Sequence, residues 1–241
     1  MSLKQMLLLL SFGLSGISLP FSYLPSRFEV VESAGALVSY NISLISNKPV
    51  TEEVDLSLST WEVTGDQFLF YPFSEGWVFL PTAHITIPPD SSQILSFGFK
   101  VPDSVGEKRF QLNFSTELEN ASFRFSKTIP VYLVISGTEI VKCRIVTFDI
   151  LHKGDSLQVN CMIENEGNVH IRPRIDIQFQ GDPTWIRVQD DVPVYPFSQR
   201  QLGNIVPLPE KGREGALVNV RVQYYDIRGS IHTVSDQVRV R

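Results

Sequence analysis

The strongest constraint on the fold is an alternation of apolar and polar residues with a period of two. It is visible at residues 38–44, 54–58, 94–99 and 110–114. Because successive side chains of a β-strand point to opposite faces, this period predicts strands that bury one face. Pro, Gly and Asn separate the strands, and no segment after residue 22 shows the apolar spacing of a helix. We therefore expect an all-β protein made of sandwiches.

The alternating pattern runs through two segments of similar length. A continuous apolar strand ends at a Ser-Gly-Thr turn at 136–138, and the pattern restarts at Ile140. Each segment has about the 100 residues that one immunoglobulin-like sandwich needs. We expect two such sandwiches in tandem, at residues 23–136 and 137–241, joined by a short linker that restricts the angle between them.

The first 22 residues have the layout of a secretory signal peptide. Lys4 precedes an apolar run at residues 6–14, and small residues follow it. The run is too short to span a hydrocarbon core of about 30 Å as a helix, and a retained N-terminal anchor is the alternative. We expect cleavage after Ser18 or after Ser22, with Ser18 preferred. The protein is therefore expected in the periplasm or secreted.

Composition narrows the classes of partner and chemistry. The formal net charge of −5 becomes −6 when Lys4 is removed, and no basic stripe suggests a nucleic-acid partner. No Gly-x-Ser-x-Gly, phosphate-binding glycine loop or Cys-x-x-Cys motif occurs. Four histidines without metal-site spacing are expected at surface or rim positions: His84, His152, His170 and His232. We expect a binding protein without cofactor, metal, enzymatic activity or membrane span.

The turns and strands resemble those of the periplasmic pilus-assembly chaperones, the PapD-like proteins. The most specific segment is a Pro-rich turn with a Ser/Gln pair at 87–93, followed by a strand, Val101-Pro102 and residues 106–110. In the second half, residues 165–170 are similar to a turn in the second domains of such proteins. The resemblance covers most of the chain after the signal. It implies two sandwiches that capture a polypeptide without a cofactor.

The resemblance also implies a basic pair in a cleft, which in such chaperones anchors the terminal carboxylate of a client. Arg27 in the first strand and Lys127 in the last strand of the first domain are the nearest candidates. Counting back from Tyr132, however, the lysine position of the family falls on Ile129. The chain therefore departs from the usher-dependent chaperones at this site.

The last strand of the first domain is the candidate binding edge. Five large apolar residues alternate onto one face of it: Phe123, Phe125, Ile129, Val131 and Leu133. Such a row beside unpaired backbone groups can complete the sheet of another protein, whereas the alternative is that these residues fill the core. We expect the first two to bind a partner, the last three to pack inside, and Lys127 to meet a client carboxylate with help from Arg27.

Six aromatic residues crowd into residues 68–79. An exposed aromatic patch would bind carbohydrate or protein, whereas the favoured alternative places most of the six in the core or in the groove between the domains. Because Pro72 interrupts regular strand pairing, the expected exposed members are Phe70, Tyr71 and Phe73.

Cys143 and Cys161 are the two cysteines of the chain, and export would place them in an oxidising compartment. They flank an expected turn at 152–155, with their midpoint at residue 152. Residues that face each other across a hairpin lie close enough for a bridge after a small adjustment. We expect a disulfide, with two buried reduced thiols as the alternative.

Together these features favour an exported, chaperone-like protein. Its partner would be a pilin-like subunit or another envelope or secreted protein, bound non-covalently, with β-strand addition as the expected mode. The first alternative is a structural or adhesive module of a surface appendage or envelope complex. The second is a carbohydrate-binding module that uses the aromatic cluster.

Overall fold

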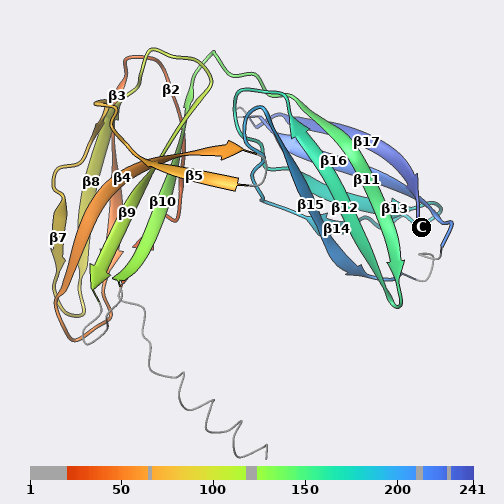
Figure 1. Ribbon diagram of the computed structural model, residues 1–241, viewed down its shortest axis with the longest axis horizontal. Helices are drawn as coiled ribbons and strands as arrows, with labels where there is room; N and C mark the ends of the chain where they lie inside the picture. Colours follow the sequence, from red (N-terminus) through yellow and green to blue (C-terminus); the bar gives the residue numbers. More distant parts are fainter. Residues whose placement is uncertain (1–20, 65–66, 118–123, 210–213, 227–228) are drawn as a thin grey trace, which may run out of the picture.

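The computed structural model describes residues 21–64, 67–117, 124–209, 214–226 and 229–241 (Figure 1). All regular secondary-structure elements in these ranges are β-strands, which confirms the predicted all-β class. The expectations for the signal peptide up to residue 20 and for Phe123 lie outside the described ranges.

The first group of strands runs from Ser22 to Ile135. It consists of β1 (Ser22–Leu24), β2 (Phe28–Glu32), β3 (Leu37–Ile45), β4 (Glu52–Thr64), β5 (Gln67–Pro72), β6 (Val78–Phe79), β7 (His84–Ile87), β8 (Ser92–Lys100), β9 (Glu107–Glu117) and β10 (Arg124–Ile135). One sheet has the order β1-β3-β8-β6, and the other has the order β2-β10-β9-β4-β5, with β7 also paired to β4.

Alternating side chains of these two sheets meet in one core. On β9 every second residue from Phe110 to Phe114 is buried, and β8 contributes Phe97 and Phe99 in the same way. Phe21, just before β1, is 1% exposed and belongs to the same cluster. The period of two in the sequence thus corresponds to one buried and one solvent-facing side of each strand.

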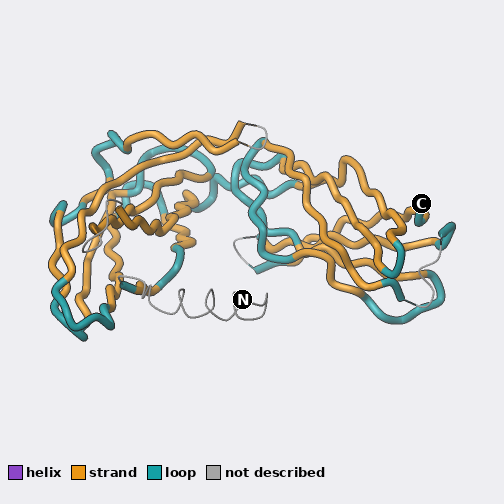
Figure 2. Tube along the Cα trace, turned by 60° about the horizontal axis from the view of Figure 1, so that its bottom comes forward, coloured by secondary structure: helices purple, strands orange, loops and turns teal. Residues whose placement is uncertain are grey.

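The second group of strands begins at Cys143. It consists of β11 (Cys143–Lys153), β12 (Ser156–Asn165), β13 (Arg174–Phe179), β14 (Ile186–Gln189), β15 (Ser198–Pro207), β16 (Leu217–Tyr225) and β17 (Ile231–Arg239). The sheet β11-β12-β15 packs on the sheet β14-β13-β16-β17 around a separate apolar core. Figure 2 shows the strands gathered into two bodies with loops where the bodies meet.

The two cysteines do not face each other. In the β11–β12 hairpin, Cys143 lies opposite Asn165 and Cys161 lies opposite Phe148. The expected facing pair is wrong because the turn is centred near Gly154, later than residue 152, and the bulge before Thr147 shifts the partner of Cys143 by only one residue. Both cysteines are free and buried in the second core.

Burial raises the pKa of both thiols, Cys143 and Cys161, to about 12. Because the thiolate is the reactive form, we expect neither cysteine to react with iodoacetamide in the folded protein near pH 8. After unfolding in denaturant without reductant, intact mass spectrometry should show two added alkyl groups. No addition in denaturant would instead mean that the two sulfurs are bonded.

Candidate functional site

A buried acid–base contact joins the two sandwiches. Glu107, the first residue of β9, has a fully buried side chain that accepts hydrogen bonds from the backbone N–H of His170 at 2.9 Å and from its ring Nδ1. The backbone N–H of Glu107 donates to the carbonyl of Asn168 at 3.0 Å. Gly106, at φ +71°, allows this approach because it has no Cβ. A Cβ at this position would lie 2.7 Å from the Asn168 oxygen. The domains therefore meet backbone to backbone.

The imidazole of His170 is 9% exposed and lies between two carboxylates. Its Nε2 is 3.7 Å from Glu29 of β2, and its ring lies 4.3 Å from the ring of Tyr132 on β10. Burial lowers the pKa of His170, but the hydrogen bonds to Glu107 and Glu29 outweigh burial and raise it above its ordinary value. The expected surface or rim position of His170 is wrong, because residues from both sandwiches cover it.

Arginines from both domains surround Glu29. Arg172 Nε donates to Glu29 at 2.8 Å, and the guanidinium of Arg27 lies 3.0 Å from the same carboxylate. Arg27 also donates both terminal nitrogens to Asp191 of the second domain, at 2.9 and 3.2 Å. The hydrogen bond with His170 and the nearby arginines lower the pKa of Glu29 to about 2, against the opposing effect of burial. The predicted residue Arg27 thus joins the domains.

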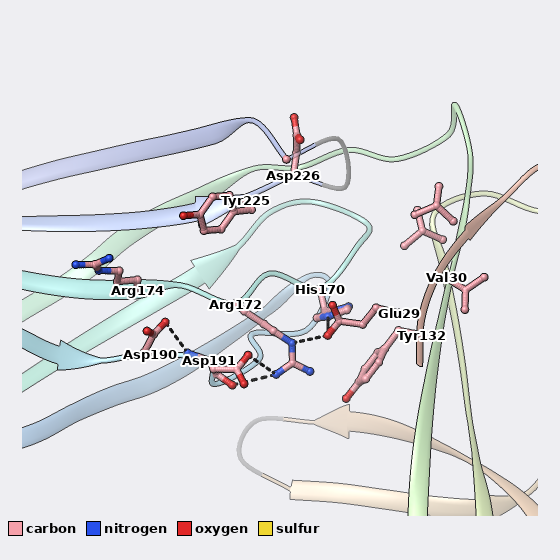
Figure 3. A pocket seen from close by; sticks show the side chains of 13 residues that line it. Glu29, Val30, Tyr132, His170, Arg172, Arg174, Asp190, Asp191, Tyr225 and Asp226 are labelled. Carbon is pink, nitrogen blue, oxygen red and sulfur yellow. Dashed lines mark hydrogen bonds and ion pairs between the residues drawn. The ribbon is translucent and has the colours of Figure 1, made fainter. Parts of the chain in front are cut away.

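A cavity of about 660 Å³ lies in the cleft beside this network (Figure 3). Its first-domain wall includes Glu29, Val31 and Tyr132, and its second-domain wall includes Arg174 and Tyr225. Figure 3 shows Arg172 reaching across to Glu29 while Asp191 holds its other side. The first-domain wall is therefore apolar apart from Glu29. It lies opposite a charged wall, whose Arg172 already pairs with Glu29 and Asp191.

Lys127 does not join Arg27 in the cleft. Tyr132 lies opposite Glu29 in the β10–β2 pair, so the even-numbered residues of β10 face the cleft and Lys127 faces the first core. Its ammonium group donates to the Phe21 carbonyl and lies 5.1–5.5 Å from the rings of Phe21, Tyr23 and Phe125. Burial lowers the pKa of Lys127. The structure thus places the two predicted basic residues on opposite faces of one sheet.

Strand β10 has a partner on both sides along only part of its length. β9 pairs with it from Arg124 to Val134, whereas β2 pairs with it only from Val131 onward. The chain before β2 leaves this sheet, because β1 pairs with β3 in the opposite sheet. Residues 124–130 of β10 therefore have no strand on one side among the described residues.

Two backbone hydrogen bonds at the end of β10 define which groups face that open side. Ile135 N–H donates to Gly106 on the β9 side, and Ser136 N–H donates to Glu32 on the β2 side. By strand alternation, even-numbered residues point their N–H and C=O groups away from β9. The hydroxyl of Tyr23 donates to the Thr128 carbonyl at 2.9 Å, as this orientation requires. Pro130 has the same parity, so its missing N–H weakens no bond to β9.

The odd-numbered side chains in the second half of β10 are buried, as predicted. Ile129, Val131 and Leu133 are fully buried in the first core, which confirms the expected core packing. Phe125 is half-buried and lies on the same face, beside Lys127. Phe125 is thus an apolar side chain next to the open backbone edge.

The aromatic cluster is split between surface and core. Phe70 and Tyr71 of β5 are exposed, in line with the expectation. Phe73 differs from it, because its ring packs against Trp77 and Phe110 at 5.2 and 5.6 Å and belongs to the first core. The strand ends at Pro72, and the chain then turns back over the sandwich.

A second set of aromatic rings lies at the domain contact. Trp61, Tyr132 and Tyr195 form a small buried cluster, and the hydroxyl groups of the two tyrosines lie 3.3 Å apart. The guanidinium of Arg109 lies 5.1 Å from the ring of Tyr195. These residues, like Glu107 and Arg172, carry no local sequence motif, because their partners in the other domain are 60 or more residues away. Only the pairing of the strands brings them together.

Solved structures of fimbrial chaperones match the fold over nearly the whole chain. The class 5 fimbriae chaperone CfaA matches with a TM-score of 0.53 at 11% identity, over 90% of this chain and 98% of that one. The YadV chaperone matches with a TM-score of 0.52 at 13% identity, over 91% and 100%. This is the PapD-like chaperone fold. It confirms the two immunoglobulin-like sandwiches that the sequence predicts.

A third match is a chain in the structure of the Salmonella enterica SafA pilin in complex with the SafB chaperone. Its TM-score is 0.51 at 13% identity, over 92% of this chain and 99% of that one. No family model matches the sequence, and no curated protein matches it. The similarity to PapD-like chaperones is thus a similarity of fold.

Two further observations concern the described residues. None of their elements is a helix long and apolar enough to cross a bilayer. No three or more of their His, Cys, Asp and Glu side chains are arranged to hold a metal ion.

The domain contact should depend on the charge of His170. Replacing it in His170→Gln leaves two buried or half-buried carboxylates facing a neutral amide, which should cost about 2–3 kcal/mol of unfolding free energy near pH 6. The His170 pKa is raised in the folded state. Its contribution is therefore complete below about pH 6.5 and is lost as pH rises through the folded value.

Chemical denaturation at several pH values tests this dependence. Between mildly acidic and alkaline pH, the original protein should lose more stability than His170→Gln. The matched control is His152→Gln, at the exposed end of β11, which should keep the original pH dependence. Equal pH dependence in the original protein and His170→Gln would contradict the assignment.

Proposed function

We propose that this chain is an exported, chaperone-like protein that captures a polypeptide by β-strand addition at residues 124–130 of β10. The observation that carries the proposal is the half-paired state of β10, which has β9 on one side and no described strand on the other. A client strand there would receive backbone hydrogen bonds from the outward-facing groups of Arg124, Ser126 and Thr128. Such main-chain pairing needs no cofactor.

The chemistry of this edge suits a client whose own sheet lacks a strand. Phe125 offers an apolar side chain on the core-facing side, and Lys127 places a cation beside it. Phe123 adds a second apolar residue to the same proposal by alternation. A pilin-like subunit or another envelope assembly component with an unfinished sheet would meet these requirements. The fold neighbours support this class, because the matching structures include chaperones in complex with a pilin and with a tip adhesion subunit.

Arg27 takes a positioning role in this proposal. Its guanidinium is held by Glu29 and Asp191, so a client carboxylate would have to displace an existing ion pair to reach it. Lys127 is the better candidate for a charged contact with the client, since it lies on the strand that the client would extend. A charge-assisted hydrogen bond there would strengthen the capture.

Export is part of the same proposal. Phe21 is 1% exposed in the first core, so cleavage after Ser22 would remove a core side chain, whereas cleavage after Ser18 would keep it. Burying a phenylalanine contributes about 2–3 kcal/mol. We therefore favour cleavage after Ser18, and the intact mass of the exported protein distinguishes the two sites.

A proline at Ser126 tests strand addition directly. Ser126→Pro removes an N–H that faces the open side and leaves the hydrogen bonds to β9 in place. We expect this variant to fold normally but to capture at least about tenfold less client. Ser126→Ala keeps the N–H and is the matched control, expected to capture as the original does.

The measurement uses a photo-cross-linking residue at Thr128 in exported protein, followed by mass spectrometry of its adducts. The proposal expects a discrete polypeptide adduct that disappears with Ser126→Pro and persists with Ser126→Ala. Undiminished capture by a folded Ser126→Pro protein would refute strand addition. Recovery of the chain only as a fixed-stoichiometry part of an appendage would favour the structural alternative, and binding to glycans alone would favour the carbohydrate-binding one.

A further inference from the structure

The β4–β5 hairpin extends beyond the first sandwich. β4 pairs with β9 from Asp55 to Ser59, and with β5 from Ser59 to Thr64. Among the described strands, β5 pairs with β4 alone and forms the end of its sheet. Figure 1 shows the two strands reaching toward the second domain, where the ring of Phe68 meets Tyr195 at 5.6 Å.

β5 is exposed on both faces and is apolar on both. Four consecutive residues have large apolar or aromatic side chains, with exposed fractions of 40% for Phe68, 41% for Leu69, 58% for Phe70 and 43% for Tyr71. A strand that covers a core would show this exposure only at every second residue. The contact with Tyr195 covers part of one face and leaves the edge of the strand open.

β5 also lacks the features by which edge strands avoid pairing with other chains. Proteins protect such edges with charged side chains, bulges, internal prolines or short length. β5 has six residues, no Asp, Glu, Lys, Arg or His, an unbroken register with β4, and a proline only at its last position. Every other described edge strand of four or more residues contains Asp, Glu, Lys, Arg or His. The remaining edge strands, β1 and β6, contain none of these, but they have only three and two residues.

We propose that β5 is a self-association edge, at which two copies of this chain pair their β5 strands antiparallel about a two-fold axis. The partner of an uncharged strand with two apolar faces must itself be uncharged and apolar on both faces, and β5 of a second copy meets this requirement. An axis at Phe70 sets Phe70 opposite the Phe70 of the second copy and sets Leu69 opposite Tyr71, so that each pair shares one face of the sheet. Both are cross-strand pairs of the kind that stabilise antiparallel sheets.

This inference does not rest on the proposed function. β5 and β10 lie in the same sheet but are separated by β4 and β9, so pairing at β5 leaves residues 124–130 of β10 open. A six-residue edge buries less than the roughly 1,600 Å² of a standard interface. The dimer should therefore dissociate on dilution through the micromolar range.

Sedimentation velocity over a series of protein concentrations tests the proposal. We expect a monomer–dimer equilibrium in which Phe70→Lys raises the dissociation constant by roughly tenfold or more, because each interface receives two lysines. The matched control is Ile94→Lys on β8, an inner strand of the other sheet, where the side chain is 65% exposed. It should leave the equilibrium unchanged.

Leu69→Lys places the charge on the opposite face of β5 and should weaken the dimer in the same way. Thermal unfolding of each variant shows whether the domain has stayed folded. The proposal is overturned by a monomer at every concentration, including one whose β5 binds a different protein. A dimer that survives both β5 lysines, or that Ile94→Lys weakens equally, also overturns it.

Discussion

The buried contact between Glu107 and His170 is the interaction on which the arrangement of the two domains depends. A carboxylate with no solvent exposure is tolerated only when charge and hydrogen bonds compensate its lost hydration. Here the backbone and ring of His170 supply both. Removing one member of such a pair typically costs about 3–5 kcal/mol. The ion pairs of Arg27 and Arg172 surround this contact with more exposed groups and contribute less individually.

Linker contacts add to the same constraint. Asn168 accepts a hydrogen bond from Ile140 N–H at 2.6 Å and donates to the Thr138 carbonyl at 2.9 Å, so one side chain fastens the connection between the sandwiches. Gly167 lies so close to the linker that a Cβ would be 2.1 Å from the Ile140 oxygen. These contacts hold one wall of the cleft in place. The start of the chain contributes to both sheets of the first domain, because β1 pairs with β3 and β2 pairs with β10. Residues 124–130 of β10 are thereby left with β9 on one side and no described strand on the other, so the candidate binding edge is a consequence of the topology.

Much of the fold could be predicted from the sequence, because alternation and turn residues are local signals. The buried row Ile129, Val131 and Leu133 followed directly from that period. Contacts between distant segments could not be predicted in this way. His170 had no visible partner, since Glu107 lies 63 residues away in the chain. Cys143 does not face Cys161 because the centre of the turn lies later in the chain than expected, which shifts the hairpin register. Lys127 lies on the strand where a basic cleft residue was expected, but odd-numbered residues of β10 face the core and not the cleft.

Strand addition requires that the even-numbered backbone N–H groups in the first half of β10 are open in the free protein and become paired when a client binds. Residue-resolved amide hydrogen exchange measures this directly. If β10 captures a client by strand addition, we expect fast amide exchange for Ser126 and Thr128 and slow amide exchange for Lys127 and Ile129 in the free protein. In the purified client complex, the first two should also become slow. Slow exchange of Ser126 and Thr128 before any client is bound, or an unchanged exchange rate on complex formation, would contradict strand addition at β10.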